Sequence, residues 1–141
     1  MLSPSLKALV PFISVDHMMQ LVNQVDLEPV LTGLAHYLED DYKRWQSFDK
    51  TPRIASHSDA GVIELMSISD KNTYGFKYVN GHPQNTRNGL QTVTAFGLLA
   101  DVKTGHPMLL TEMTLLPALR TAAMSAVAAK YWPPRQLEQW R

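Results

Sequence analysis

The sequence predicts an α/β fold with an α+β-like layer, in which a mixed β-sheet packs against two long helices. In residues 27–42, apolar side chains recur at three- and four-residue spacing, which is typical of an amphipathic helix. A second helix is predicted from a Thr114 N-cap to the prolines at 133 and 134, which end it. Between these helices, short runs of β-branched and aromatic residues alternate with Gly, Asn and Asp, a pattern typical of strands and turns.

The N-terminal part predicts two successive helices. Residues 15–25 predict a short one, for which either Ser14 or Asp16 is a suitable N-cap. The longer one begins at Asp26 and ends near Phe48. Its charged segment "EDDYKR" is interpreted as a face exposed to solvent.

The middle of the chain predicts the sheet. Turn signals at "DAG" and "KTG" separate apolar runs, and a long polar loop, "NGHPQNTRNG", interrupts them. The predicted strands are 9–13 (a strand or an extended arm), 53–58, 62–68, 73–79, 91–102 and 106–111.

The composition excludes several classes of function. With 13 basic and 13 acidic residues the net charge is zero, so no global charge favours nucleic acid or acidic membranes. The lack of cysteine excludes disulfides, thiolate zinc sites and cysteine nucleophiles, and it agrees with a cytoplasmic location. The five histidines are too scattered to predict a metal site, and no signal peptide or 20-residue apolar run is evident.

Two charged residues stand in apolar strands. Alternation places Glu64 on a face with Val62 and Met66, and it places Lys77 between Gly75 and Val79. A buried ion needs a partner, a changed protonation state or a cleft. One interpretation is a site in which these two residues and the arginines at 53 and 120 bind an amino acid.

Simpler interpretations stay open at this point. Segment 73–79 can be an edge strand with Lys77 in water, or Glu64 and Lys77 can pair across adjacent strands. Arg120 can cover apolar surface with its aliphatic stem.

Four segments together resemble the ornithine cyclodeaminase/mu-crystallin family. They are "RxASHSxxGVIELM" (residues 53–66), "FKYVNGHPxNT" (76–86), "LLADVKTGHPMLLTEMT" (98–114) and "ALRTAAMSAVAAKY" (118–131). The resemblance covers roughly residues 10–131, and its "ELM" and "KYVNGHP" segments favour the ornithine cyclodeaminase branch.

The resemblance implies an NAD-dependent conversion of L-ornithine to L-proline and ammonia. In that reaction a hydride leaves the substrate Cα for the nicotinamide and later returns to the cyclic imine, so that the cofactor emerges unchanged. Intramolecular attack of the δ-amine on the first imine benefits from proximity.

The resemblance also implies roles for individual residues. Glu64 and Lys77 are the expected catalytic pair, with Glu64 acting on a substrate amine. Arg53, Lys77, Met66 and Arg120 are expected to bind substrate, and Thr92 and Arg120 to contact NAD.

The family's second, dinucleotide-binding (Rossmann) domain has no counterpart in the sequence, which lacks its glycine-rich loop. We therefore expect residues 1–132 to be a substrate-binding and dimerisation domain, 133–141 a divergent tail, and the chain alone to be inactive. Ser67 stands where the family usually has proline.

Several partners and functions remain open. The expected partners are L-ornithine or a similar amino acid, a second copy of the chain, an intact paralogue or a separate Rossmann chain. The alternative functions are a non-catalytic dimerisation or ligand-binding module and part of an amino-acid dehydrogenase or imine reductase.

Overall fold

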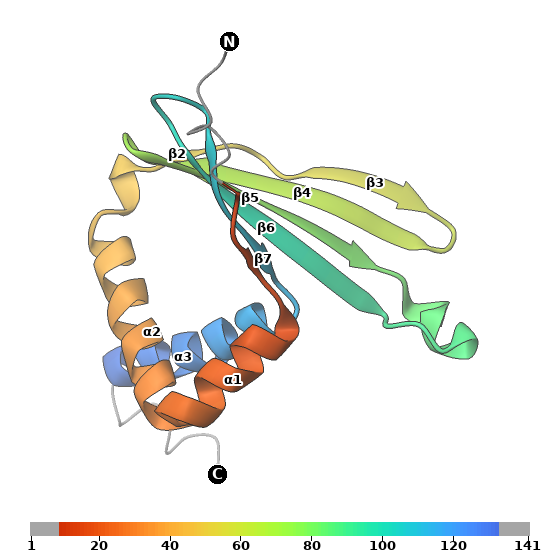
Figure 1. Cartoon of the computed structure of the whole chain (residues 1–141), viewed down its shortest axis with the longest axis horizontal. Coiled ribbons are helices and arrows are strands. Elements are labelled where there is room, and N and C mark those ends of the chain that lie inside the picture. Colours follow the sequence, from red (N-terminus) through yellow and green to blue (C-terminus); the bar gives the residue numbers. More distant parts are fainter. Residues whose placement is uncertain (1–8, 133–141) are drawn as a thin grey trace.

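The computed structural model describes residues 9–132 and shows three α-helices on one side of a β-sheet (Figure 1). The chain passes between the sheet and helix layers three times, at residues 13–15, 43–49 and 112–115. The elements are β1 (Phe12–Ile13), α1 (Val15–Val25), α2 (Leu27–Lys43), β2 (Asp49–Lys50), β3 (Ile54–Ser58), β4 (Gly61–Ser69), β5 (Thr73–Gly81), β6 (Val93–Asp101), β7 (Pro107–Glu112) and α3 (Leu115–Tyr131), with 3-10 turns at Trp45–Ser47 and Pro83–Asn88.

The seven strands form one mixed sheet in the order β1-β7-β6-β5-β4-β2, with β3 also paired to β4. β1 runs parallel to β7, and the other pairs are antiparallel. The predicted fold class is therefore confirmed. The edge-strand interpretation of residues 73–79 is wrong, because β5 lies in the centre of the sheet between β4 and β6.

The capping residue of α1 agrees with the sequence prediction, whereas the end of α2 differs from it. Ser14 caps α1 through a capping box: its Oγ accepts the His17 N–H at 3.3 Å, and His17 Nδ1 accepts the Ser14 N–H at 3.1 Å. α2 ends at Lys43, earlier than predicted, because the chain continues as a 3-10 turn and the short strand β2. Neither of these two elements was predicted from the sequence.

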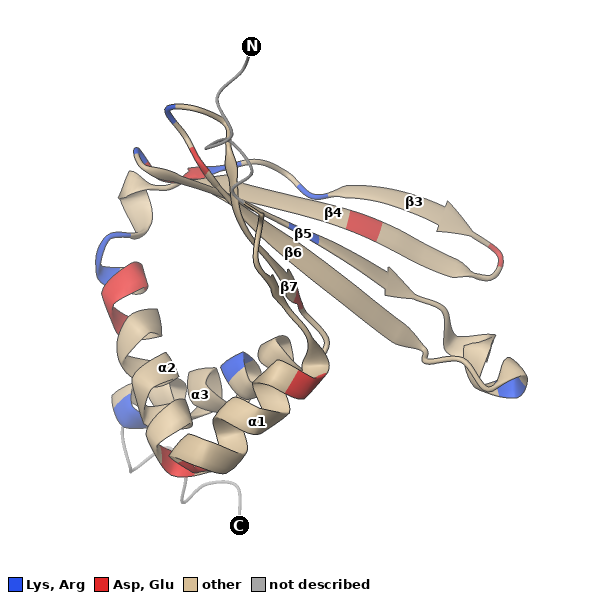
Figure 2. Cartoon of the chain, in the orientation of Figure 1, with Lys and Arg blue, Asp and Glu red and all other residues tan. Residues whose placement is uncertain are grey.

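The end of α2 is charged and exposed, as expected for "EDDYKR" (Figure 2). Arg44 also reaches the β4–β5 turn, where its Nη1 donates to Asp70 Oδ2 at 2.9 Å. The other Asp70 oxygen accepts the backbone N–H groups of Asn72 and Thr73, each at 2.8 Å. These two backbone bonds, and then Arg44, lower the pKa of Asp70 to about 2.

The Asp70 carboxylate should therefore stabilise the fold in a pH-dependent way. Its folded pKa of about 2 lies below the unfolded value of about 3.9, so the contribution is complete above the unfolded value and is lost as the pH falls toward 2. We expect Asp70→Asn to lower the free energy of unfolding at pH 6 and to match the unsubstituted chain near pH 2. Urea unfolding at both pH values measures this.

The matched control for that experiment is Asp59→Asn in the β3–β4 turn. Within residues 9–132 the Asp59 side chain forms no hydrogen bond or ion pair. An Asp70→Asn effect that is equally large at pH 2 and pH 6 would contradict the proposed titration.

The buried apolar core is small. Its members within the described residues are Met18, Ala95, Ala100, Ala123 and Val127. Large apolar side chains remain accessible on the sheet face away from the helices, including Leu65 (43% exposed) and Phe96 (40%). This sheet face is therefore open to a further partner. None of the described helices has the length and apolarity needed to cross a bilayer.

Candidate functional site

Strand register places Lys77 in the middle of the sheet face that looks toward the helices. Its direct neighbours across the sheet are Met66 on β4 and Gly97 on β6, and Gly97 in turn lies opposite Thr111 on β7. The next row toward the β4–β5 turn contains Ile68, Gly75, Leu99 and Leu109. Lys77 therefore projects from a largely apolar surface.

Gly97 leaves the space that Met113 occupies beside Lys77. A Cβ atom at Gly97 would collide with the Met113 sulfur and would lie 3.1 Å from the Phe76 carbonyl oxygen. Only glycine therefore permits Met113 to pack this closely against the sheet. The Met113 side chain therefore packs directly against the sheet at Gly97, the residue opposite Lys77.

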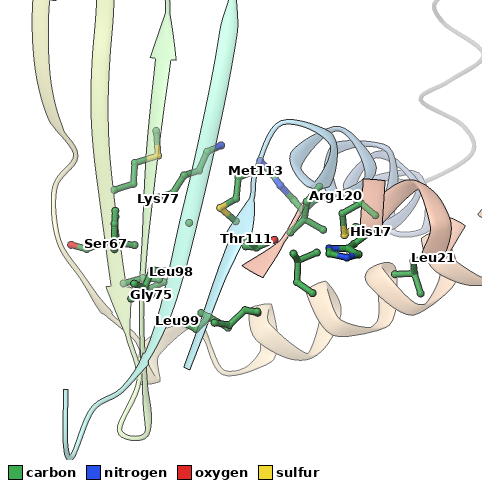
Figure 3. A pocket seen from close by; sticks show the side chains of 18 of the residues that line it. His17, Leu21, Ser67, Gly75, Lys77, Leu98, Leu99, Thr111, Met113 and Arg120 are labelled. Carbon is green, nitrogen blue, oxygen red and sulfur yellow. The ribbon is translucent and has the colours of Figure 1, made fainter. Parts of the chain in front are cut away.

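A cavity of about 1050 Å³ separates this sheet face from the helices. Lys77 enters it from β5 and Arg120 enters it from α3, with Met113 between them in Figure 3. Within residues 9–132 neither cation forms an ion pair. The two cations therefore bring two positive charges into one cavity between the sheet and helix layers.

Burial and positive charge together act on Lys77. Its pKa is lowered from the ordinary lysine value, first by burial and then by the charge of Arg120, while Glu64 opposes the change. A bound carboxylate would relieve the repulsion between the two cations. The electrostatics of the cavity thus favour an anionic ligand.

Glu64 lies on the same sheet face as Lys77, one residue pair further along the strands, opposite Val79. At this position it does not line the cavity. Arg53 Nη1 donates to Glu64 Oε1 at 2.9 Å, and the Glu64 side chain is only 20% exposed. The interpretation that Glu64 and Lys77 pair across adjacent strands is therefore wrong, because Arg53 is the partner. Arg53 thus holds the Glu64 side chain in place beside Lys77.

The polar loop after β5 is organised by Asn80. Its Oδ1 accepts the backbone N–H of Thr94 at 2.6 Å and the Thr94 hydroxyl at 2.5 Å. The His82 N–H donates to the Thr92 carbonyl at 2.8 Å, which closes the base of the loop. Thr92 is five residues from Gly97 along the chain, about 16 Å at strand spacing, and it does not line the cavity.

Comparison with known proteins decides the family. The model of the ornithine cyclodeaminase/mu-crystallin family matches residues 15–139. The chain belongs to this family. It is also 68% identical over 135 residues to the ornithine cyclodeaminase of Brucella abortus biovar 1 (strain 9-941), and the matched part is 96% of this chain and 37% of that protein.

Two solved structures agree with this family fold. Thermococcus litoralis Δ1-pyrroline-2-carboxylate reductase, solved with NADH and L-proline, has a TM-score of 0.70 and 29% identity, covering 85% of this chain and 37% of that one. Lysine cyclodeaminase, studied for its recognition of L-lysine, L-ornithine and L-2,4-diaminobutyric acid, has a TM-score of 0.67 and 25% identity at the same coverage. The chain thus spans little more than a third of the length of these two proteins and of the Brucella relative.

The structure brings together only part of the residue set that the family resemblance implied. Met66, Lys77 and Arg120 line the cavity. Arg53 and Glu64 form a separate ion pair next to it, and Thr92 directly precedes β6, outside the cavity lining. Metal ligands are not clustered either: within the described residues no group of three His, Cys, Asp or Glu side chains comes together.

Sequence reasoning missed Glu112, which is buried at 6% exposure. Its Oε2 accepts the N–H groups of Thr114 (2.6 Å) and Leu115 (2.9 Å), and its Oε1 accepts that of Leu116 at 3.2 Å. Thr114 makes no side-chain cap bond, so Glu112 is the actual cap of α3. An acidic residue just before a helix was the available signal.

Proposed function

We propose that this chain is the amino-acid-binding part of an ornithine cyclodeaminase. The observation that carries the proposal is the Lys77–Arg120 pair, two cations that face one cavity from different layers. The high identity to a curated ornithine cyclodeaminase supports L-ornithine as the substrate. Residues 1–132 would form the substrate-binding and dimerisation domain.

The roles of the residues follow from their positions. Lys77 and Arg120 bind the substrate carboxylate and hold the Cα in a defined place, while Met66 shapes the wall beside them. Arg53 keeps Glu64 oriented, and the Glu64 carboxylate accepts a hydrogen bond or a proton from the substrate α-amine, next to the carboxylate that Lys77 binds. Lys77 and Glu64 are thus the proposed catalytic pair.

NAD is the proposed cofactor, and it would accept a hydride from the substrate Cα and return it. Arg120 fits a cofactor contact, because its guanidinium is exposed and has no ionic partner within residues 9–132. Thr92 would have to contact a different part of NAD, since it lies outside the cavity. Two such contacts are few for a dinucleotide, so we expect weak binding by this chain alone.

The direct test measures ammonia and proline released from L-ornithine by the 141-residue chain with NAD. The assay is repeated with the chain extended by the segment that completes its relatives. We expect little turnover by the chain alone, turnover by the extended protein, and loss of that turnover in Lys77→Ala. Formation of NADH without ammonia would instead indicate an amino-acid dehydrogenase, and no reaction in either form would refute the enzymatic proposal.

A dimerisation module is the second candidate function, and the uncovered sheet face favours it. The Phe96 ring stacks on Tyr78 at 5.0 Å between centroids and meets Phe76 edge-on at 6.1 Å. This aromatic cluster lies on the sheet face opposite Lys77, and none of the helices within residues 9–132 covers it (Figure 1). We propose that a second copy of the chain covers it.

Phe96→Glu should therefore convert a dimer into a monomer. A carboxylate in the centre of an apolar interface would be desolvated without a partner, which weakens association by orders of magnitude. Sedimentation velocity measures the change. Tyr37→Glu is the matched control, since Tyr37 is 75% exposed on α2, away from the sheet. A Phe96→Glu protein that sediments as the unsubstituted chain does would contradict this assignment.

A further inference from the structure

Among the described residues, the cavity is lined by basic side chains without acidic ones. Its cations, Lys77 and Arg120, lie together, and within residues 9–132 no aspartate or glutamate lines it. The nearest candidate, Glu64, is paired with Arg53 and lies outside the lining. A ligand with a single carboxylate finds its counter-charge here, but a second ammonium at the far end of the ligand does not.

The walls beyond the cations are apolar. From the sheet come Ile68, Leu99 and Leu109, and from the helices come Met18, Leu21 and Leu116. The polar side chains at this end belong to α1, and none of them is a carboxylate: His17, Gln20 and Gln24, all exposed to solvent. An ammonium group that reaches them stays hydrated and gains little, and one that lies against the apolar walls loses its hydration without an ionic partner.

We propose that the cavity built by this chain selects α-amino acids with an unbranched apolar side chain over diamino acids of the same length. The inference rests on the proposed function, because the carboxylate is bound by the same two cations. Discrimination in favour of L-ornithine must then come from an acidic group outside residues 9–132.

L-norvaline and L-ornithine are a matched pair of ligands. Both carry the same carboxylate, α-ammonium and three-carbon side chain, and only L-ornithine has the terminal ammonium. L-alanine supplies the baseline with one side-chain carbon. Each buried methylene is worth about fourfold in Kd, so L-norvaline should bind about fifteenfold more tightly than L-alanine. L-ornithine should bind no more tightly than L-alanine.

The methionines make the test specific to this cavity. Met113 lies between the two cations, and Met18 lines the apolar end, so that ¹³C-labelled methyl groups report on both regions. Met108, on the opposite sheet face and 42% exposed, is the internal control. The experiment titrates the three amino acids into the 141-residue chain and into Lys77→Met, following the methyl shifts.

The expected result is L-norvaline as the tightest ligand, shifts at Met113 and Met18 but not at Met108, and equal weakening of L-norvaline and L-ornithine in Lys77→Met. Tighter binding of L-ornithine than of L-norvaline, still dependent on Lys77, would overturn the selectivity and leave the proposed function intact. If no ligand shifts Met113, or if affinity does not depend on Lys77, both the selectivity and the proposed carboxylate site fail.

Discussion

Replacing Lys77 by methionine should weaken binding of an α-amino acid carboxylate by about 10- to 100-fold, the range for loss of one charge-assisted hydrogen bond. Methionine keeps the length and the apolar stem of lysine, so the change isolates the charge. Isothermal titration with L-norvaline or L-ornithine measures the affinity. In the extended protein, the same substitution should lower turnover of L-ornithine by a larger factor, because a misplaced Cα also loses its orientation for reaction.

The stability of that variant should move in the opposite direction. Burial lowers the pKa of Lys77, so the charged form destabilises the folded state at neutral pH. Because the pKa of Lys77 is lower in the folded state, the unfolded chain binds more protons between the two pKa values. The free energy of unfolding therefore rises as the pH increases from the folded pKa toward the unfolded value of about 10.4. We therefore expect Lys77→Met to unfold in urea at a concentration equal to or above that of the unsubstituted chain.

Lys71→Met is the matched control for both measurements. Lys71 is an exposed lysine in the β4–β5 turn and forms no ion pair within the described part of the chain. It should change neither ligand affinity nor stability. Equal affinities of Lys77→Met and Lys71→Met would show that the carboxylate is bound elsewhere, and a strong loss of stability in Lys77→Met would assign the lysine a structural role.

Glu112→Ala should cause the largest loss of stability among single substitutions near the site, about 3 kcal/mol. Three backbone N–H groups at the start of α3 would lose their acceptor in a part-buried position, and each hydrogen bond to a charged group contributes about 1.5–3 kcal/mol without full additivity. Urea unfolding monitored by circular dichroism gives the free energy. Amide exchange of Leu115 and Leu116 should accelerate more than that of the sheet.

The same substitution tests how Arg120 is positioned. Arg120 lies one helical turn after Leu116, so loosening the first turn of α3 should displace the guanidinium from the cavity. Ligand affinity should then fall in Glu112→Ala but not further when Arg120→Ala is added, because the two changes act through one contact. Thr114→Ala is the control, since the Thr114 side chain makes no cap bond, and a similar loss from it would refute the cap assignment.

Much of the fold follows from local sequence patterns. The sequence offers Ser14 or Asp16 as the N-cap of a helix over residues 15–25, and the structure has this helix, α1, with Ser14 as its cap. Alternation of side chains in residues 73–79 correctly separates Lys77 from the aromatic cluster on the opposite face. These features depend on the backbone periods of helix and strand, which a sequence displays directly.

Other features depend on which segments become neighbours. The central place of β5, the choice of Arg53 as the partner of Glu64, and the meeting of Lys77 with Arg120 all involve residues far apart along the chain. Candidate partners for Glu64 and for Lys77 were evident in the sequence, but several were chemically equivalent. Strand register placed Arg53 beside Glu64, and the packing of α3 over the sheet placed Arg120 in the same cavity as Lys77.

The sequence by itself therefore determined the family of the chain, which side chains carry charge, which face of a strand each occupies, and where α3 begins. Only the tertiary structure decided that Lys77 and Arg120 share a cavity from which Glu64 and Thr92 are left out, and that Glu112 rather than Thr114 caps α3. The physical reason is range: periodicity and capping act over about four residues, whereas strand pairing and layer packing act across the whole chain.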